Sequence, residues 1–412
     1  MLVYLDNSAT TKQYESVTEK MIECMRGDYG NPSSLHNMGL SAEKLVREAR
    51  SQVAKAMNFS VEEVYFTSGG TEAANLAIFG VADAKKRRGN KIITTSVEHA
   101  AVLESCKKLE SSGFEVAYIG VDDKCRLNLD ELYSHLGDKT ILVSVMNVNN
   151  EVGTIMPLGE IERAKSKGEA VSRGDGKRAK GDGGASSAGK ADWVLHTDAV
   201  QAFGKMPFCG EDADVVTVSA HKIHGPKGCG AMAVRRGINV SPVIFGGGQE
   251  KNMRSGTENV AGISGFGEAV RNMNENFNDR ISYIAKLRAY LLSGIKDEIK
   301  DIKINSIEEV SLNGEAGLCS PAILNISFLG TRGEVILHGL ESEKIYVSTG
   351  AACSSNKKSK NSTLAAMGLS DKEIEGSLRF SFCEFNTIEE MDFVLVKLKE
   401  QVNKFRKLGS FR

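Results

Sequence analysis

The stretch Ser219-Ala220-His221-Lys222-Ile223-His224-Gly225-Pro226-Lys227-Gly228-Cys229-Gly230 follows an apolar run at residues 215–218 and leads through a glycine-rich turn into another apolar run. This pattern predicts a buried strand with Lys222 just beyond its end. Because burial of a charged amine is costly, a lysine in such a pocket is typical of an amine used covalently, as in a Schiff base with an aldehyde cofactor. Considered alone, Lys222 is more often a solvated loop lysine.

Two other predicted strand ends carry groups that suit an aldehyde cofactor with a phosphate. Asp198 follows the apolar run 193–196, and a carboxylate there can pair with a pyridinium nitrogen, although a helix N-cap is the alternative. At residues 66–72, Phe-Thr-Ser-Gly-Gly-Thr-Glu runs from a strand through two glycines into a helix. Its backbone N–H groups can hold a phosphate, an ordinary βα turn being the alternative. Together, the cradle, the aspartate and the lysine predict pyridoxal phosphate (PLP).

Short β-rich runs alternate with amphipathic segments between about residues 60 and 235. The predicted strands are 63–66, 91–94, 115–118, 141–145, 193–196, 215–218 and 231–234, with helices at 71–80 and 99–111 between some of them. Strands that alternate with helices indicate an α/β fold with a mostly parallel sheet. Ligands of such sheets bind beyond the carboxyl ends of the strands.

The character of the sequence changes after about residue 258. Apolar residues recur at helical spacing within 281–295 and 391–405, while 322–328 and 377–382 resemble strands. We therefore expect a large cofactor-binding domain at 15–258 and a smaller α+β domain. The smaller domain is expected to combine residues 1–14 with 259–412.

Composition excludes several classes of protein. The net charge of −1 argues against a dedicated nucleic-acid binder, and the apolar runs are far shorter than the roughly 18 residues of a membrane helix. The N-terminal MLVYLDNSATT lacks the features of a secretory signal, so we expect a cytoplasmic protein with free thiols. None of the eight cysteines forms a CxxC pair, and no metal site is predicted.

Residues 172–190 contain six glycines, five Lys or Arg and no Val, Ile, Leu or Phe. Such a segment cannot bury enough apolar area to offset its ordering entropy. We expect a mobile surface insertion, with a basic docking patch as the alternative.

Longer motifs of the chain resemble those of the cysteine desulfurases, fold-type I PLP enzymes of the iron–sulfur-cluster type. They follow one another in the family's order from residue 4 to about residue 382, with 172–190 as an insertion. The matching motifs are Tyr4 to Thr11, Gly30-Asn31-Pro32-Ser33-Ser34, Thr67 to Glu72, Glu98-His99, Val148 to Gly153, Asp198-Ala199-Val200-Gln201, Ser219 to Gly230, Arg254-Ser255-Gly256-Thr257 and Ser348 to Ser355.

The resemblance implies a role for each matching residue. Lys222 would bond to the cofactor aldehyde and then move the α-proton of the substrate, while His99 would stack over the ring and shuttle protons. Asp198 would pair with the ring nitrogen and Gln201 with the ring hydroxyl. The residues expected to hold the phosphate are Gly70, Thr71, Ser219, His221 and, from the other subunit of a homodimer, Thr257. Those expected to bind the substrate are Asn31, Asn149 and Arg379, the last two at its carboxylate.

Cys353 lies in the small-residue stretch 348–355, which is typical of an exposed thiol rather than a core cysteine. The resemblance implies that its thiolate attacks the sulfur of cofactor-bound L-cysteine, so that alanine leaves and a persulfide stays on Cys353. A cluster-scaffold protein or a tRNA-thiolating enzyme would then accept the sulfur. Residues 354–362 contain three lysines and no large apolar side chain, which favours a mobile segment.

Other readings remain open at this point. A selenocysteine lyase or an aminotransferase would use the same fold, and an aminotransferase needs no catalytic thiol. A catalytically silent scaffold that docks sulfur-accepting proteins is the alternative from another class. Neither a direct nucleic-acid partner nor a membrane is expected.

Overall fold

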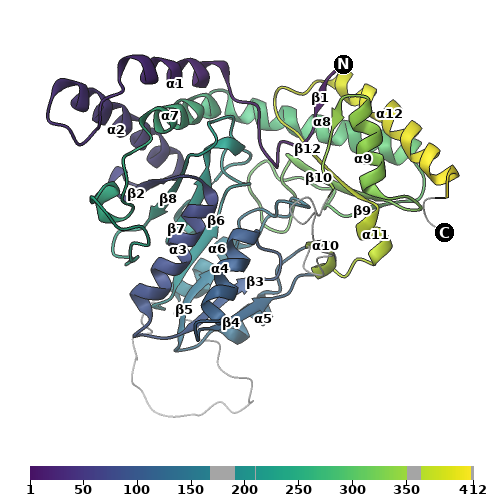
Figure 1. Ribbon diagram of the computed structural model, residues 1–412. Helices are drawn as coiled ribbons and strands as arrows, with labels where there is room; N and C mark the ends of the chain where they lie inside the picture. The colour runs from purple at the N-terminus through teal and green to yellow at the C-terminus, as the bar shows by residue number, and fades with distance from the viewer. Residues whose placement is uncertain (168–190, 209, 350–362, 410–412) are drawn as a thin grey trace, which may run out of the picture.

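The computed structural model describes residues 1–167, 191–208, 210–349 and 363–409, shown in colour in Figure 1. The predicted insertion 172–190 and the predicted nucleophile Cys353 lie outside these residues.

A seven-stranded sheet forms the centre of the larger part of the molecule (Figure 1). Its order is β2 (Val64–Thr67), β8 (Gly230–Val234), β7 (Val215–Ser219), β6 (Val194–Asp198), β5 (Thr140–Ser144), β3 (Lys91–Thr95) and β4 (Glu115–Ile119). β8 is antiparallel to both neighbours, and every other pairing is parallel. The mostly parallel α/β sheet predicted from the sequence is confirmed, with strand ends shifted by one or two residues.

Helices cover both faces of this sheet, because successive strand residues alternate between two apolar clusters. Val215 belongs to the cluster under α3 (Gly70–Lys85) and α4 (Ala100–Glu110), whereas Val216 and Val218 belong to the cluster on the other face. The helices that contribute to this second cluster include α1 (Glu15–Gly27), α2 (Asn37–Met57), α5 (Leu129–His135), α6 (Leu158–Ser166) and α7 (Val260–Asn274). Burial on both faces explains why the strands carry apolar residues on both sides.

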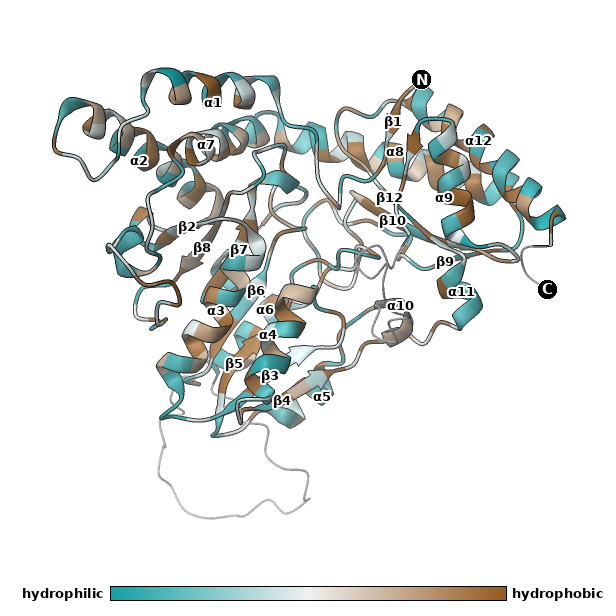
Figure 2. Ribbon diagram, in the orientation of Figure 1, coloured by the Kyte–Doolittle hydropathy of each residue, from teal (hydrophilic) through white to brown (hydrophobic). Residues whose placement is uncertain are grey.

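The smaller part is built around β10 (Ile323–Phe328), which pairs antiparallel with both β12 (Ser377–Ser381) and β9 (Ile302–Ile304). α8 (Phe277–Glu298) and α9 (Gly333–Ser342) pack against this sheet, and α12 (Ile388–Lys407) packs against both of these helices. The short helices α10 (Thr363–Ala366) and α11 (Asp371–Glu375) complete the smaller part. In Figure 2 the brown sides of these long helices alternate with teal sides, as expected of amphipathic helices. This arrangement confirms a smaller α+β unit at the C-terminal end.

The N-terminus belongs spatially to this smaller part. β1 (Val3–Tyr4) pairs with β11 (Ile345–Tyr346), and Asp6 forms a bridge with Ser381. The N-terminus accordingly lies beside α12 in Figure 1. The domain limits at residues 14 and 258 stay a prediction, and α7, just beyond the second limit, lies against α1 and α2.

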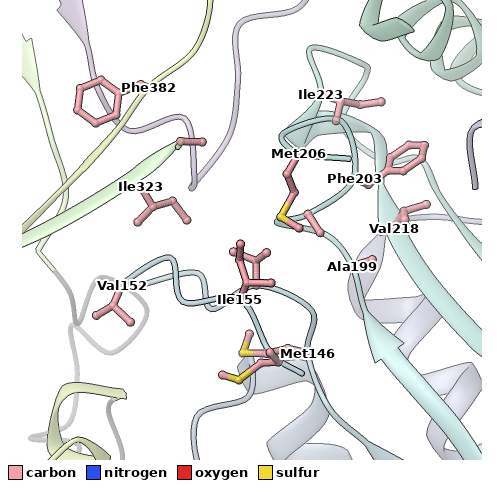
Figure 3. Packing of buried hydrophobic residues seen from close by; sticks show 14 of the residues in the cluster. Met146, Val152, Ile155, Ala199, Phe203, Met206, Val218, Ile223, Ile323 and Phe382 are labelled. Atoms are coloured by element: carbon pink, nitrogen blue, oxygen red, sulfur yellow. The ribbon is translucent and has the colours of Figure 1, made fainter. Parts of the chain in front are cut away.

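Apolar side chains also join the two parts. Met146, Ile155 and Val218 come from the large sheet and its loops, while Ile323 and Phe382 come from the smaller sheet (Figure 3). These residues belong to one buried cluster, which therefore includes side chains of both sheets. No helix among the described residues is both long and apolar enough to cross a membrane.

Candidate active site

Most of the predicted site residues come together at one edge of the large sheet. β2, β3, β5, β6 and β7 run in the same direction, so their last residues share this edge. These last residues are Thr67, Thr95, Ser144, Asp198 and Ser219. The edge is where an open α/β sheet binds its ligands.

Lys222 lies at this edge, at the end of the short 3-10 turn Ala220–Lys222 that follows β7. Its Nζ donates hydrogen bonds to the carbonyls of Ser8 and Ala9, at 2.5 and 2.7 Å. The amide and the hydroxyl of Thr11 both bond to the carbonyl of His221. The N-terminal segment therefore crosses the strand ends and positions the lysine.

Both His99 and Lys222 lie close enough to Asp198 for their charges to affect its carboxyl. Burial raises the pKa of the Asp198 carboxyl, and the nearby His99 and Lys222 oppose that rise. Asp198 Oδ1 accepts a hydrogen bond from the Val200 amide. His99 caps α4, where its Nδ1 accepts from the Ala101 amide at 3.2 Å. A neutral His99 consequently carries its proton on Nε2.

The predicted phosphate cradle lies where β2 passes into α3. Gly69 has a φ of 155°, and a Cβ on Gly70 would lie 3.0 Å from Val200 Cγ2 and 3.5 Å from Ser219 Cβ. The buried Ser219 Oγ has no hydrogen-bond partner among the described residues. The first N–H groups of α3 are also without helical partners, as in every helix, so a hydroxyl donor and a helix N-terminus adjoin each other here.

PLP fits this arrangement of donors and acids. An unpartnered serine hydroxyl beside a helix N-terminus suits a phosphate, and a buried carboxylate favours a positively charged ring nitrogen nearby. The Lys222 amine lies close enough to Asp198 to affect the pKa of its carboxyl. The residues present therefore match the three chemical groups of the cofactor.

His221 and Gln201 complete this part of the edge. Burial, and then Lys222, lower the pKa of His221 to about 4, so its ring is neutral near pH 7. Its Nδ1 lies 3.1 Å from Thr10 Oγ1. Gln201 Nε2 donates to the Ser8 carbonyl at 2.9 Å, which leaves its second N–H for another acceptor.

Arg379, on β12, reaches the same edge from the smaller domain. Its Nη1 donates to the Asn150 carbonyl and its Nη2 to Asp6 Oδ1, each at 2.9 Å. The buried Nε has no hydrogen-bond partner among the described residues. An arginine has five N–H donors, so this guanidinium retains capacity for a carboxylate.

Asn149 is fully buried, and its amide already bonds to protein. Its Oδ1 accepts from the amides of Glu151 and Val152, and its Nδ2 donates to the Val97 carbonyl at 3.1 Å. These bonds shape the loop after β5. A substrate carboxylate at Asn149 would therefore share an amide that is already engaged.

The described residues on either side of the segment 350–362, which contains Cys353, bond to the two predicted substrate-binding residues Arg379 and Asn149. Before residues 350–362, Ser348 forms a backbone bridge with Arg379, with N–O distances of 2.7 and 3.2 Å. After them, Thr363 Oγ1 accepts from Asn149 Nδ2 at 3.3 Å. Cys353 itself lies outside the described residues.

Two predicted residues are not brought to this edge by the chain's own fold. Asn31 is exposed in the α1–α2 connection, where its Oδ1 accepts from the Ser33 amide. That connection lies at the far side of Figure 1 from β12. Thr257 is exposed in the loop before α7, and Arg254 of the same loop forms an ion pair with Glu72 of α3 at 2.8 Å.

The six described cysteines are all buried and free. Burial is the main cause that raises the pKa of Cys106, Cys229 and Cys383 to about 12. It also raises the pKa of the other three, Cys24, Cys125 and Cys319. A reactive thiolate is therefore disfavoured at each described cysteine.

Several groups at this edge were not predicted from the sequence. Lys205 is buried and donates to Gln201 Oε1 at 2.6 Å, and its spacing of four residues from Gln201 was the available signal. Burial raises the pKa of Glu98 to about 8 and that of Glu151 to about 7, although Arg379 lowers the latter. Asp6 pairs with Arg379 from the opposite end of the chain.

The fold and the site define a PLP-dependent enzyme of fold type I. The family model for aminotransferase class-V matches residues 3–181 and 183–394. The cysteine desulfurase IscS of Clostridium botulinum is 38% identical over 410 residues, which cover 99% of this chain and 96% of that protein. This chain belongs to the cysteine desulfurase family.

Solved structures agree with this assignment. A NifS-like protein is 37% identical and superposes with a TM-score of 0.85, covering 98% of this chain and 100% of that chain. A structure of SspA in complex with cysteine is 27% identical with a TM-score of 0.74, and the match covers 93% of this chain and 100% of that chain.

Proposed function

We propose that this chain is a PLP-dependent cysteine desulfurase that takes sulfur from L-cysteine, releases L-alanine and keeps the sulfur as a persulfide on Cys353. One observation supports this most directly. The strand-end groups Asp198, Ser219 and Lys222 share an edge with Arg379 and Asn149, which tie down the two ends of the segment that contains Cys353.

The cofactor would be held by groups of three kinds. The N-terminus of α3 (Gly70 and Thr71), Ser219 and His221 would bind its phosphate, and Asp198 would bind its ring nitrogen. Gln201 would donate its remaining N–H to the ring hydroxyl. When bound, PLP supplies an electron sink that stabilises negative charge on the substrate's carbon skeleton.

The substrate would be oriented by Arg379, through its donors not used by Asp6 and Asn150, with Asn149 beside it. Lys222 Nζ would take the proton from the substrate's α-carbon and return a proton to the product. His99 would hold or deliver a proton at Nε2, because its Nδ1 is engaged by the Ala101 amide.

The sulfur transfer would be carried out by Cys353. Its thiolate would attack the sulfur of the bound cysteine, so that an S–S bond forms while the substrate's C–S bond breaks. The electron pair of the broken bond goes to the carbon, which gains a proton to become the methyl group of alanine. No external oxidant is required, since the substrate carbon takes the two electrons that the sulfurs give up when the S–S bond forms.

We also propose a cytoplasmic homodimer that passes its sulfur to a protein acceptor in iron–sulfur cluster assembly or tRNA thiolation. Exposed apolar residues on the segments that carry Asn31 and Thr257 support self-association. They are Tyr29, Leu35, Leu40, Val243, Ile244 and Phe245. A dimer would let these two exposed residues reach a neighbouring site, and a reactive thiol favours a reducing compartment.

Product analysis tests this function. The purified protein, loaded with PLP and given L-cysteine and a reducing thiol, is expected to form alanine and sulfide in equal amounts. Formation of a 2-oxo acid would indicate an aminotransferase, and release of selenium without release of sulfur from matched substrates would indicate a selenocysteine lyase. Absence of any turnover by PLP-loaded protein would favour the silent scaffold.

Replacing Arg379 by Gln is expected to raise the KM for L-cysteine by about 10- to 100-fold, because a hydrogen bond to a charged group contributes about 1.5–3 kcal/mol. Steady-state kinetics measures this change. The matched control is Asp6→Asn, which removes the same ion pair but keeps the guanidinium. An equal rise of KM in both variants would contradict carboxylate binding by Arg379.

A further inference from the structure

Lys205 is a buried lysine at the candidate site for which the proposed reaction has no use. It lies beyond β6, and the residue is 7% exposed. Its Nζ donates a hydrogen bond of 2.6 Å to Gln201 Oε1, four residues earlier in the chain. A lysine in such a place is costly to bury, so its contact with Gln201 calls for an explanation.

The contact is the first link of a chain of hydrogen bonds that reaches Lys222. Gln201 Nε2 donates to the Ser8 carbonyl at 2.9 Å. The same carbonyl accepts from Lys222 Nζ at 2.5 Å. Lys205, Gln201, Ser8 and Lys222 are thus connected by consecutive bonds within the site.

The donor and acceptor types in this chain permit one orientation of the Gln201 amide. The Lys205 amine donates a proton to Gln201 Oε1. The Ser8 carbonyl can only accept, so the amide must direct its donor, Nε2, toward Ser8. A rotated amide would place its oxygen against the Ser8 carbonyl and its NH₂ group against the Lys205 amine. The bond to the Ser8 carbonyl would be lost in either charge state of Lys205, and the bond to Lys205 whenever its amine is charged, in a buried place where unmade hydrogen bonds are costly.

We propose that Lys205 is a positioning residue of the cofactor site, which locks the Gln201 amide so that Nε2 faces the Ser8 carbonyl and the cofactor ring. This inference rests on the proposed function, because Gln201 is assigned to the ring hydroxyl by that proposal. Lys205 itself touches neither substrate nor cofactor in this account. Its effect is transmitted through Gln201.

The charges around Lys205 are compatible with this role. Burial is the main cause that lowers the pKa of Lys205 well below that of a free lysine, and Lys222 and Arg379 lower it further. Cys383 and Asp6 act in the opposite direction, and Lys205 in turn lowers the pKa of His221. In either charge state the amine keeps a proton that it can donate to Gln201 Oε1.

The test replaces Lys205 by Met, which keeps the length of the side chain and removes the donor. PLP is expected to dissociate about two- to twelvefold faster, the effect of one hydrogen bond of about 0.5–1.5 kcal/mol. The pH midpoint of the visible absorbance of bound PLP is expected to rise, because the donor to the ring hydroxyl is misplaced. Unchanged dissociation and an unchanged midpoint would overturn the proposal.

The control is Lys165→Met, which also removes a buried lysine but one bonded to Asp214, the residue just before β7. This variant is expected to unfold at a lower temperature with an unaltered PLP midpoint. Should Lys205→Met fail to fold, Lys205→Gln gives the same measurements. A midpoint shift of equal size in the Lys165 variant would show a general structural effect and contradict the proposal.

A double-mutant cycle shows whether Lys205 acts through Gln201. In a Gln201→Ala background, Lys205→Met is expected to have no further effect on PLP dissociation or on the midpoint. Additive effects would overturn the positioning role. The wild-type products from L-cysteine are measured separately, so failure of this cycle with normal alanine and sulfide formation would leave the desulfurase function intact.

Discussion

Replacing Cys353 by Ala is expected to lower sulfide release from L-cysteine by at least about a thousandfold, since removal of a covalent nucleophile leaves only the residual catalysis by binding and the remaining groups. The variant is expected to keep its bound PLP and its yellow colour, because Lys222, Asp198 and the phosphate cradle lie on the large sheet. Sulfide production and the visible spectrum are measured on the same preparation.

A matched control for Cys353→Ala is Cys24→Ala, which removes a buried thiol of α1 that lies outside the site. We expect this variant to release sulfide at the wild-type rate. Wild-type sulfide release by Cys353→Ala would eliminate the persulfide mechanism. Equal loss in both variants would show that the loss comes from disturbed folding rather than from the missing nucleophile.

Replacing Lys222 by Ala is expected to lower turnover by about 10²- to 10⁴-fold, the usual contribution of a positioned acid–base group. PLP is expected to remain bound through its phosphate and ring contacts but to lose its covalent link to the protein. Borohydride reduction followed by peptide mapping measures this link. In the wild type it is expected to attach PLP to the peptide that contains Lys222, and in the variant to attach none.

Lys227→Ala serves as the control for Lys222→Ala, because Lys227 is exposed and only five residues further along the same loop. It is expected to leave both turnover and reductive labelling unchanged. Labelling at Lys205 or Lys227 in the wild-type protein would contradict the assignment of Lys222.

Features that depend on local sequence were predictable. The strands of the large sheet were found because apolar runs bounded by turn residues leave few alternatives, and Asp198 and Lys222 were found because polar residues directly follow two of those runs. Parallel strands bring their carboxyl ends to one edge, so these residues could be placed together without knowledge of the tertiary structure.

Features that depend on contacts between distant segments were not predictable. The Ser8 carbonyl meets Lys222 across 214 residues, and Asp6 meets Arg379 across 373 residues. Nothing in the local pattern of either segment specifies these contacts, because they follow from the docking of the N-terminus on the smaller domain. The resemblance to the family supplied Arg379, whereas Lys205, which resemblance did not supply, was found in the structure alone.

The most direct test of the account is the mass of Cys353 after one turnover. The PLP-loaded protein is mixed with L-cysteine in the absence of a reducing thiol, and its peptides are analysed while alanine is quantified. We predict that the peptide containing Cys353 gains the mass of one sulfur atom, with one alanine released for each modified subunit. Alanine formation with an unmodified Cys353 peptide would contradict the account.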